Sequence, residues 1–132
     1  MLYCIDTNLI VDIFRGDKNL LLKLEEVAKE KNHFCITFLN LAELFKGAYL
    51  SVKKEENTHL IEEFIKNIEI LNLNKEACRI YGEKFAELKK QGKQTQEIDL
   101  LIGAIVISHN AFLITRNKKH FENISDLKVI EW

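Results

Sequence analysis

The sequence contains no proline and only five glycines among its 132 residues, and no proline-, glycine- or serine-rich stretch divides it into parts. We therefore expect a single domain over residues 1–132, which is long enough to bury a substantial core. The chain has no apolar run near the about 18 residues that a membrane-spanning helix needs, and no basic segment followed by a long apolar one at its start. These absences predict a protein that neither crosses a membrane nor is secreted.

Cysteine is scarce and charge is nearly balanced. Cys4, Cys35 and Cys78 form no CxxC pair, and an odd, scattered set of cysteines predicts reduced core thiols in a cytoplasmic protein. With 19 Lys and Arg against 20 Asp and Glu, the formal net charge is -1. The chain thus lacks the basic surface of a protein that holds nucleic acid by bulk attraction. This balance argues against a histone-like binder but not against an enzyme that meets phosphates through a metal ion.

The chain opens on a short apolar run that ends in a carboxylate. Residues 2–5 have the character of a buried strand, Asp6 follows, and Thr7 and Asn8 can cap a helix. Asp6 is therefore expected at the carboxyl end of a strand, where open α/β sheets bind their ligands. Two interpretations remain open from this stretch alone, because Asp6 can line a ligand site or merely cap the helix.

Strand-like and helical segments alternate along the chain, which predicts an α/β fold with a mainly parallel sheet covered on both faces. Residues 53–57 are expected to form a charged corner, and residues 117–122 a polar turn or short helix. The helix over residues 75–90 is expected to turn Ala77, Ile80, Tyr81, Phe85 and Leu88 inward and to end near Gly92. The predicted strands are residues 2–5, 33–37, 69–73, 111–115 and 127–130, and the predicted helices are the one after Asp6 and residues 20–31, 39–50, 60–68, 75–90 and 98–108.

Two further acids lie in apolar helical surroundings. Asp99 begins a helix that is apolar nearly all round, so it either complements the helix dipole or awaits a cation. Glu43 lies within Leu41–Phe45, and Asn40 and Gly47 share its stripe of the helix. No cap explains Glu43, so it either pairs with a lysine that lines the core or belongs to a site.

Asp6, Glu43 and Asp99 cannot share one charged site without a cation. Two like charges about 4 Å apart repel by about 4 kcal/mol at an effective dielectric constant of about 20. Mg²⁺ or Mn²⁺ suits a set of oxygen ligands, keeps several waters and usually takes one or two carboxylates directly. The three acids together therefore predict a site for a hard divalent cation.

The segment that follows the strand over residues 111–115 is a fourth candidate. Thr115 and Asn117 can hold a water molecule at the expected edge of the sheet, and Arg116, Lys118 and Lys119 can meet a phosphate backbone. An ordinary polar loop is the alternative.

Four stretches carry a resemblance to a known family: Ile5–Asn8, Asn40–Ala48, Asp99–Ala104 and Leu113–Phe121. In this order and spacing, the chain resembles a PIN domain and, more narrowly, a VapC-type toxin ribonuclease. The resemblance covers essentially the whole chain. It implies a three-layer α/β/α sandwich with a five-stranded parallel sheet, a homodimer, Mg²⁺ or Mn²⁺, and RNA as substrate. It also implies an antitoxin that wraps the toxin and can place an arginine or lysine in the acidic site.

Carried over residue by residue, the resemblance assigns the family's acids to Asp6, Glu43 and Asp99. The position of a fourth acid is matched by Asn117, so the site would hold one formal charge fewer, which argues against a second firmly held ion. Asp12 and Glu97 are interpreted as surface or supporting groups rather than as ligands.

The expected reaction is metal-assisted hydrolysis of RNA phosphodiester bonds. Asp6 and Asp99 are expected at the ion, and Glu43 is expected to orient or activate the attacking water. No histidine is required, and His120 is the one that can touch RNA. The expected supporting or substrate-binding residues are Thr7, Asn8, Asn40, Thr115, Arg116 and Asn117.

Two rival interpretations remain. The chain can be an inactive or weakly active interaction module of the same fold, acting through a partner or a dimer surface, as the neutral Asn117 and the near-zero net charge suggest. A phosphotransfer or receiver-type domain also places acids at strand ends. That class fits less well, because Asn8 rather than an acid stands two residues after Asp6 and because two of the acids lie on helices.

Overall fold

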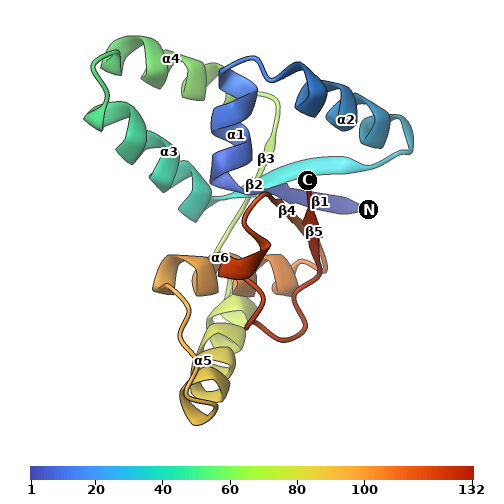
Figure 1. The fold of residues 1–132 in the computed structure, drawn as a ribbon, viewed down its shortest axis with the longest axis vertical. Coiled ribbons are helices and arrows are strands. Elements are labelled where there is room, and N and C mark those ends of the chain that lie inside the picture. Colours follow the sequence, from blue (N-terminus) through green and yellow to red (C-terminus); the bar gives the residue numbers. More distant parts are fainter.

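The computed structural model describes residues 1–132, and a five-stranded sheet forms its centre (Figure 1). The strands stand in the order β3-β2-β1-β4-β5, and every neighbouring pair is parallel. The predicted parallel sheet is therefore confirmed, with the first strand in the middle. The strands are β1 (Leu2–Ile5), β2 (His33–Thr37), β3 (Glu69–Leu71), β4 (Phe112–Thr115) and β5 (Val129–Glu131).

Helices cover both faces of the sheet, which confirms the expected α/β/α arrangement (Figure 1). Four helices pack on one face: α1 (Thr7–Phe14), α2 (Lys18–Lys29), α3 (Phe38–Leu50) and α4 (Lys54–Ile65). The other face carries α5 (Lys75–Lys90) and α6 (Glu97–Ser108), and a 3-10 helix, η1 (Lys118–His120), follows β4. None of these helices combines the length and apolar character needed to cross a membrane.

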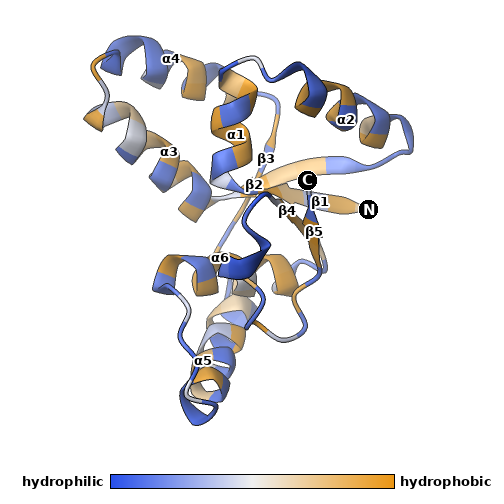
Figure 2. Cartoon of the chain, in the orientation of Figure 1, coloured by the Kyte–Doolittle hydropathy of each residue, from blue (hydrophilic) through white to orange (hydrophobic).

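Alternating side chains of the central strands divide the core into two halves. One set faces α5 and α6, and the next residue along each strand faces the layer of α1 to α4. In Figure 2 the central strands are accordingly coloured mainly as hydrophobic, apart from the start of β2, and the helices alternate between hydrophobic and hydrophilic residues. The first set is Cys4, Cys35 and Leu113, and the second is Ile5, Ile36 and Ile114.

The register of the strands brings their carboxyl ends to one edge. Ile5 stands opposite Ile114, and Cys4 stands opposite Cys35. The pairing continues one residue beyond β1, because the backbone N–H of Asp6 donates to the carbonyl of Ile114 at 2.9 Å. Asp6 therefore lies beside the ends of β2 and β4, at the edge where ligands bind in open α/β sheets.

The charged segment 53–57 is not a corner, because α4 begins at Lys54. Lys and Glu are good helix formers, and Glu55 and Glu56 lie in the first turn, where the helix dipole favours negative charge. The apolar stripe of this helix starts at Leu60, nearly two turns after the helix itself. A prediction from apolar spacing alone therefore placed the start too late.

Two positions on α5 also differ from expectation. Phe85, predicted to point inward, is 46% exposed, whereas its neighbour Lys84 is buried. Cys78, predicted to be a core thiol, is exposed, while Cys4 and Cys35 are buried as expected. The buried stripe of α5 passes through Ala77, Lys84 and Leu88, so Cys78 and Phe85 lie one residue, or about 100°, away from it.

Lys84 is buried because its ammonium group reaches partners far along the chain. The side chain is 3% exposed, and its Nζ lies 2.6 Å from Asp126 Oδ2 and 2.9 Å from Ser125 Oγ. Glu87 Oε2 accepts a hydrogen bond from the same serine at 2.7 Å. Lys84 thus fastens α5 to the segment that leads into β5, and its alkyl stem fills part of the core.

Replacing Lys84 by alanine is expected to lower the free energy of unfolding by about 2–4 kcal/mol, because it opens a cavity and releases the segment at residues 125–126. Urea denaturation measures the change. Lys84→Met, which refills the volume without the charge, should recover most of the loss. Lys89→Ala, at an exposed position of the same helix, is the control and should stay within about 0.5 kcal/mol of the parent. An unaltered urea midpoint for Lys84→Ala would contradict this account.

Candidate functional site

Asp6 connects the end of β1 to the start of α1. It is the N-cap of α1 and is only 7% exposed. Hydrogen bonds hold its side chain from two sides. Its Oδ1 accepts from the backbone N–H of Thr7 at 2.9 Å, and its Oδ2 accepts from Thr115 Oγ1 at 2.7 Å. Burial raises the pKa of Asp6 above its usual range, and these two hydrogen bonds oppose that rise. Asp6 is therefore both a cap and a buried acid at the ligand-binding edge.

A chain of hydrogen bonds positions Glu43. Thr7 Oγ1 donates to Glu43 Oε1 at 2.7 Å and accepts from Asn40 Nδ2 at 3.0 Å. The fully buried Asn40 is itself fixed, because its Oδ1 accepts from both the backbone N–H and the hydroxyl of Thr37. The start of α1, the end of β2 and the first turns of α3 are thereby joined around the carboxylate of Glu43. Its other oxygen, Oε2, accepts no hydrogen bond from the protein.

Asp99 faces this network from the first turn of α6. Its side chain is only 14% exposed, yet its carboxylate accepts no hydrogen bond, and the nearest basic nitrogen is His120 Nδ1 at 3.8 Å. Burial raises the pKa of Asp99 from 3.8 to about 6; the charge of His120 opposes this rise, and the negative charges of Asp6 and Glu43 add to it. A carboxylate without hydrogen bonds, in the field of two others, is poorly stabilised by the protein alone.

The structure therefore brings the three predicted acids into one electrostatic neighbourhood. They do not form a closed cage, because no three acidic, histidine or cysteine side chains are gathered tightly enough to enclose an ion by themselves. An open set of oxygen donors is what a hard divalent ion that keeps part of its water shell can use. The donors fit Mg²⁺ or Mn²⁺ and do not fit a soft, thiolate-binding ion.

The remaining predicted residues differ in how closely they approach the acids. Thr115 contacts Asp6 directly, and the backbone N–H of Asn117 donates to Thr115 Oγ1 at 3.0 Å. Asn8 is exposed and makes no side-chain hydrogen bond. The structure thus joins Thr115 and Asn117 to the acids and leaves Asn8 outside their network.

Arg116 is engaged away from the three acids. Its guanidinium pairs with Asp12 at 2.6 Å and with Asp17 at 2.9 Å, which fastens the segment after β4 to α1 and to the start of α2. Asp12 is therefore the partner of an arginine rather than a further acid of the site. Glu97 likewise lies outside, since its Oε1 accepts from the hydroxyl of Tyr81 at 2.8 Å.

The sequence prediction missed Thr37, which orients Asn40. Its hydroxyl accepts from the backbone N–H of Asn40, and the Asn40 side chain accepts from the backbone N–H of Thr37, so the two form a capping box at the start of α3. A threonine followed by an amide three residues later, before an apolar run, is a visible signal of this motif.

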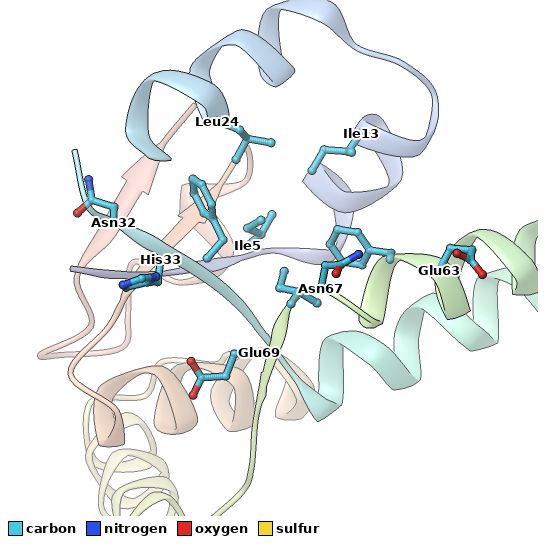
Figure 3. A pocket seen from close by; sticks show the side chains of 11 residues that line it. Ile5, Ile13, Leu24, Asn32, His33, Glu63, Asn67 and Glu69 are labelled. Atoms are coloured by element: carbon cyan, nitrogen blue, oxygen red, sulfur yellow. The ribbon is translucent and has the colours of Figure 1, made fainter. Parts of the chain in front are cut away.

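A groove separate from these acids opens among α1, α2, α4 and the neighbouring strands (Figure 3). Its volume is about 570 Å³. Ile13, Leu24 and Phe64 are among the apolar side chains that line it, and Glu63 contributes an acidic group at its edge, whereas the side chain of Glu69 points to the other face of the sheet. The groove therefore offers an apolar surface with negative charge beside it.

Comparisons with known proteins agree with this architecture. The PIN domain model matches residues 3–127. The chain is 33% identical to Ribonuclease VapC1 of Haemophilus influenzae over 132 residues, which is 100% of this chain and 98% of the relative. It is 28% identical to the tRNA(fMet)-specific endonuclease VapC of Shigella flexneri, over 98% of this chain and 97% of that protein.

A solved structure gives the same result in three dimensions. The structure of VapBC2 from Rickettsia felis, bound to a DNA fragment from its promoter, contains a chain that superposes on this one with a TM-score of 0.93. The two chains are 34% identical, and the match covers 100% of this chain and 99% of that one. The chain therefore belongs to the PIN-domain family, among the VapC ribonucleases.

Proposed function

We propose that this protein is a Mg²⁺- or Mn²⁺-dependent endoribonuclease that acts as the toxin of a toxin–antitoxin pair, with residues 1–132 working as one PIN-like domain. The carboxylate of Asp99 carries the proposal. It is nearly buried, accepts no hydrogen bond and lies in the field of Asp6 and Glu43, so the site lacks positive charge that a divalent ion would provide. The names of the relatives support RNA as the substrate class.

Asp6 and Asp99 would hold the ion between the start of α1 and the start of α6. A bound divalent cation supplies electrostatic stabilisation for the charge that develops on the phosphate and lowers the pKa of water. The hydroxyl of Thr115 and the backbone N–H of Thr7 keep Asp6 oriented, because each donates a hydrogen bond to a different oxygen of its carboxylate. Ligands that are held in place before the ion arrives bind it in a defined geometry.

Glu43 would orient the attacking water and take its proton on Oε2, the oxygen that has no partner in the protein. The water oxygen then bonds to phosphorus, the bond from phosphorus to the 3′-oxygen breaks, and that oxygen takes a proton from solvent. The products carry a 5′-phosphate and a 3′-hydroxyl. Asn40, Thr37 and Thr7 support the reaction indirectly, since they hold Glu43 in place.

The expected protein partner is a cognate antitoxin. VapBC2 of Rickettsia felis and VapBC-1 of nontypeable Haemophilus influenzae are toxin–antitoxin complexes, and each contains a chain that is 34% identical to this one. The groove of Figure 3 supports such a partner here, because its apolar lining and the acidic Glu63 at its edge suit a segment with apolar and basic side chains. An arginine or lysine of that partner would also neutralise the acids at the site.

A homodimer and a cytoplasmic location complete the proposal. Phe38, Phe85 and Ile98 are exposed apolar side chains on α3, α5 and α6, and α6 contacts both of the other helices. Exposed apolar side chains on adjoining elements suit an interface with a second copy. Cys4, Cys35 and Cys78 are free thiols, which suits a reducing compartment.

Incubation of the protein with a mixed RNA pool tests the proposed reaction. We expect cleavage with Mn²⁺ or Mg²⁺, none with EDTA, and fragments that ligase joins through their 5′-phosphates. Fragments with cyclic 2′,3′-phosphate ends would contradict the mechanism, because they form when the RNA's own hydroxyl attacks. Purified tRNA(fMet), included beside the pool, tests whether this chain shares the substrate named for the Shigella flexneri relative.

A further inference from the structure

His120 stands at the rim of the acidic site without a firm partner. It is the last residue of η1, and its side chain is 55% exposed. Its Nδ1 lies 3.8 Å from Asp99 Oδ2, which is longer than a hydrogen bond, and its ring makes no hydrogen bond elsewhere in the protein. The imidazole is thus near the reacting region while both of its nitrogens are available.

The backbone that carries this ring is firmly held. Phe121 and Ile124, which follow it, are buried, and the backbone N–H of His120 donates to the carbonyl of Asn117 at 3.0 Å. Gly103 on α6 allows the segment to approach, because a Cβ at that position would lie only 3.1 Å from Ile124 Cδ1. The backbone of His120 is therefore fixed, whereas its ring can rotate and form a hydrogen bond with another group.

Two ordinary explanations do not account for the ring. It does not support the fold, since it is exposed and its neighbours provide the anchoring contacts. It also does not match an ion that prefers oxygen ligands, because Mg²⁺ is held by carboxylates and waters. Lys118 and Lys119 share the segment, but neither forms an ion pair with the acids of the site, whereas His120 Nδ1 lies 3.8 Å from Asp99 Oδ2. Among the basic groups after β4, His120 is the one aimed at the acids.

We propose that His120 is a substrate-binding residue, whose ring donates a hydrogen bond to a nonbridging oxygen of the RNA phosphate that is being cleaved or of its neighbour. The inference rests on the proposed ribonuclease function. When Asp99 turns its oxygens to a cation, the ring loses the carboxylate that lies 3.8 Å from it, and a phosphate drawn to the same cation would come within its reach. The ring would then bind the RNA backbone, so its contribution is independent of the base sequence.

Single-turnover cleavage by His120→Ala and His120→Gln tests this role. With enzyme in excess over labelled RNA from the pool, we expect the half-saturating enzyme concentration to rise about 10-fold in His120→Ala, as for loss of one hydrogen bond to a charged group. The maximal rate should stay close to that of the parent. His120→Gln retains a side-chain N–H donor and should recover part of the binding. His59→Ala, on the exposed face of α4, is the matched control and should behave as the parent.

Three results would overturn the inference: an unchanged half-saturating concentration, a loss of Mn²⁺ affinity in calorimetry, or a fall in maximal rate alone. The melting temperature of each variant separates these results from a folding defect. If the parent cleaves no RNA, the proposed function fails instead. Fluorescence anisotropy of labelled RNA with Mn²⁺ then decides about His120 by itself, since weaker binding by His120→Ala supports the contact and equal binding rejects it.

Discussion

The Asp99→Asn variant is expected to unfold at a higher urea concentration than the parent and to cleave RNA at least about 100-fold more slowly. The asparagine keeps the shape of the side chain and removes its negative charge. In the parent, that charge is nearly buried, lacks a hydrogen bond and is repelled by Asp6 and Glu43. Stability and activity should therefore change in opposite directions at this one position.

The pH dependence of the parent gives the sign and size of the stability effect. The pKa of Asp99 rises from 3.8 to about 6 in the folded protein, so the folded state binds more protons than the unfolded state between these values. Its contribution lowers stability as pH increases through this window, is absent below about 3.8 and is complete above about 6. A shift of this size corresponds to at most about 3 kcal/mol, and we expect a gain of about 1–3 kcal/mol for Asp99→Asn at neutral pH.

Glu97→Gln is the matched control. It removes one negative charge from the same helical turn, but Glu97 bonds to Tyr81 and lies outside the acidic site. Its stability should stay within about 0.5 kcal/mol of the parent and its cleavage should be unchanged. A less stable Asp99→Asn, or one that still cuts RNA at the parental rate, would show that Asp99 is not held at a site for a cation.

Mg²⁺ or Mn²⁺ is expected to stabilise the parent strongly. An ion that binds only the folded state adds about 2.7 kcal/mol to the free energy of unfolding when its concentration is about 100 times its dissociation constant. The same addition should flatten the loss of stability with increasing pH, because the ion offsets the repulsion at Asp99. Thermal unfolding over a series of ion concentrations, at pH values on both sides of the window, measures both effects.

Asp6→Asn and Asp99→Asn should lose most of this metal-dependent shift, whereas Glu97→Gln should keep it. The two asparagine variants remove charge from the proposed ligands, so a shift that survives in them would place the ion elsewhere. Absence of any shift in the parent would favour the rival interpretation, a PIN-fold interaction module that does not cleave RNA. The test is informative because the neutral Asn117, beside Thr115, adds no negative charge that would help to hold an ion.

Local sequence patterns were sufficient to place the fold and the three acids. Strand and helix periods alternate in the correct order, although the start of α4 and several other boundaries were misplaced, so the parallel sheet follows from their alternation. Asp6 was located because a polar residue ends an apolar strand. Glu43 and Asp99 were located because each interrupts an apolar helix. Each of these signals is contained in a stretch of only a few consecutive residues.

Contacts between distant segments were not predictable in this way. Lys84 is buried because Asp126, 42 residues away, meets its ammonium group, and apolar spacing contains no trace of that pairing. Arg116 likewise turns to Asp12 and Asp17 across about 100 residues. The approach of His120 to Asp99 depends on the path of the chain after β4. Partners of charged groups therefore required the three-dimensional structure.

The central position of β1 in the sheet has a consequence for protein synthesis. β1 is synthesised long before its neighbour β4 (Phe112–Thr115), and Thr115 also secures Asp6. A nascent chain that has not reached β4 lacks both that pairing and the completed site, and such long-range pairing forms late in folding. Cleavage by the proposed site would therefore require that β4 has already been synthesised, because Asp6 is secured only once Thr115 is present.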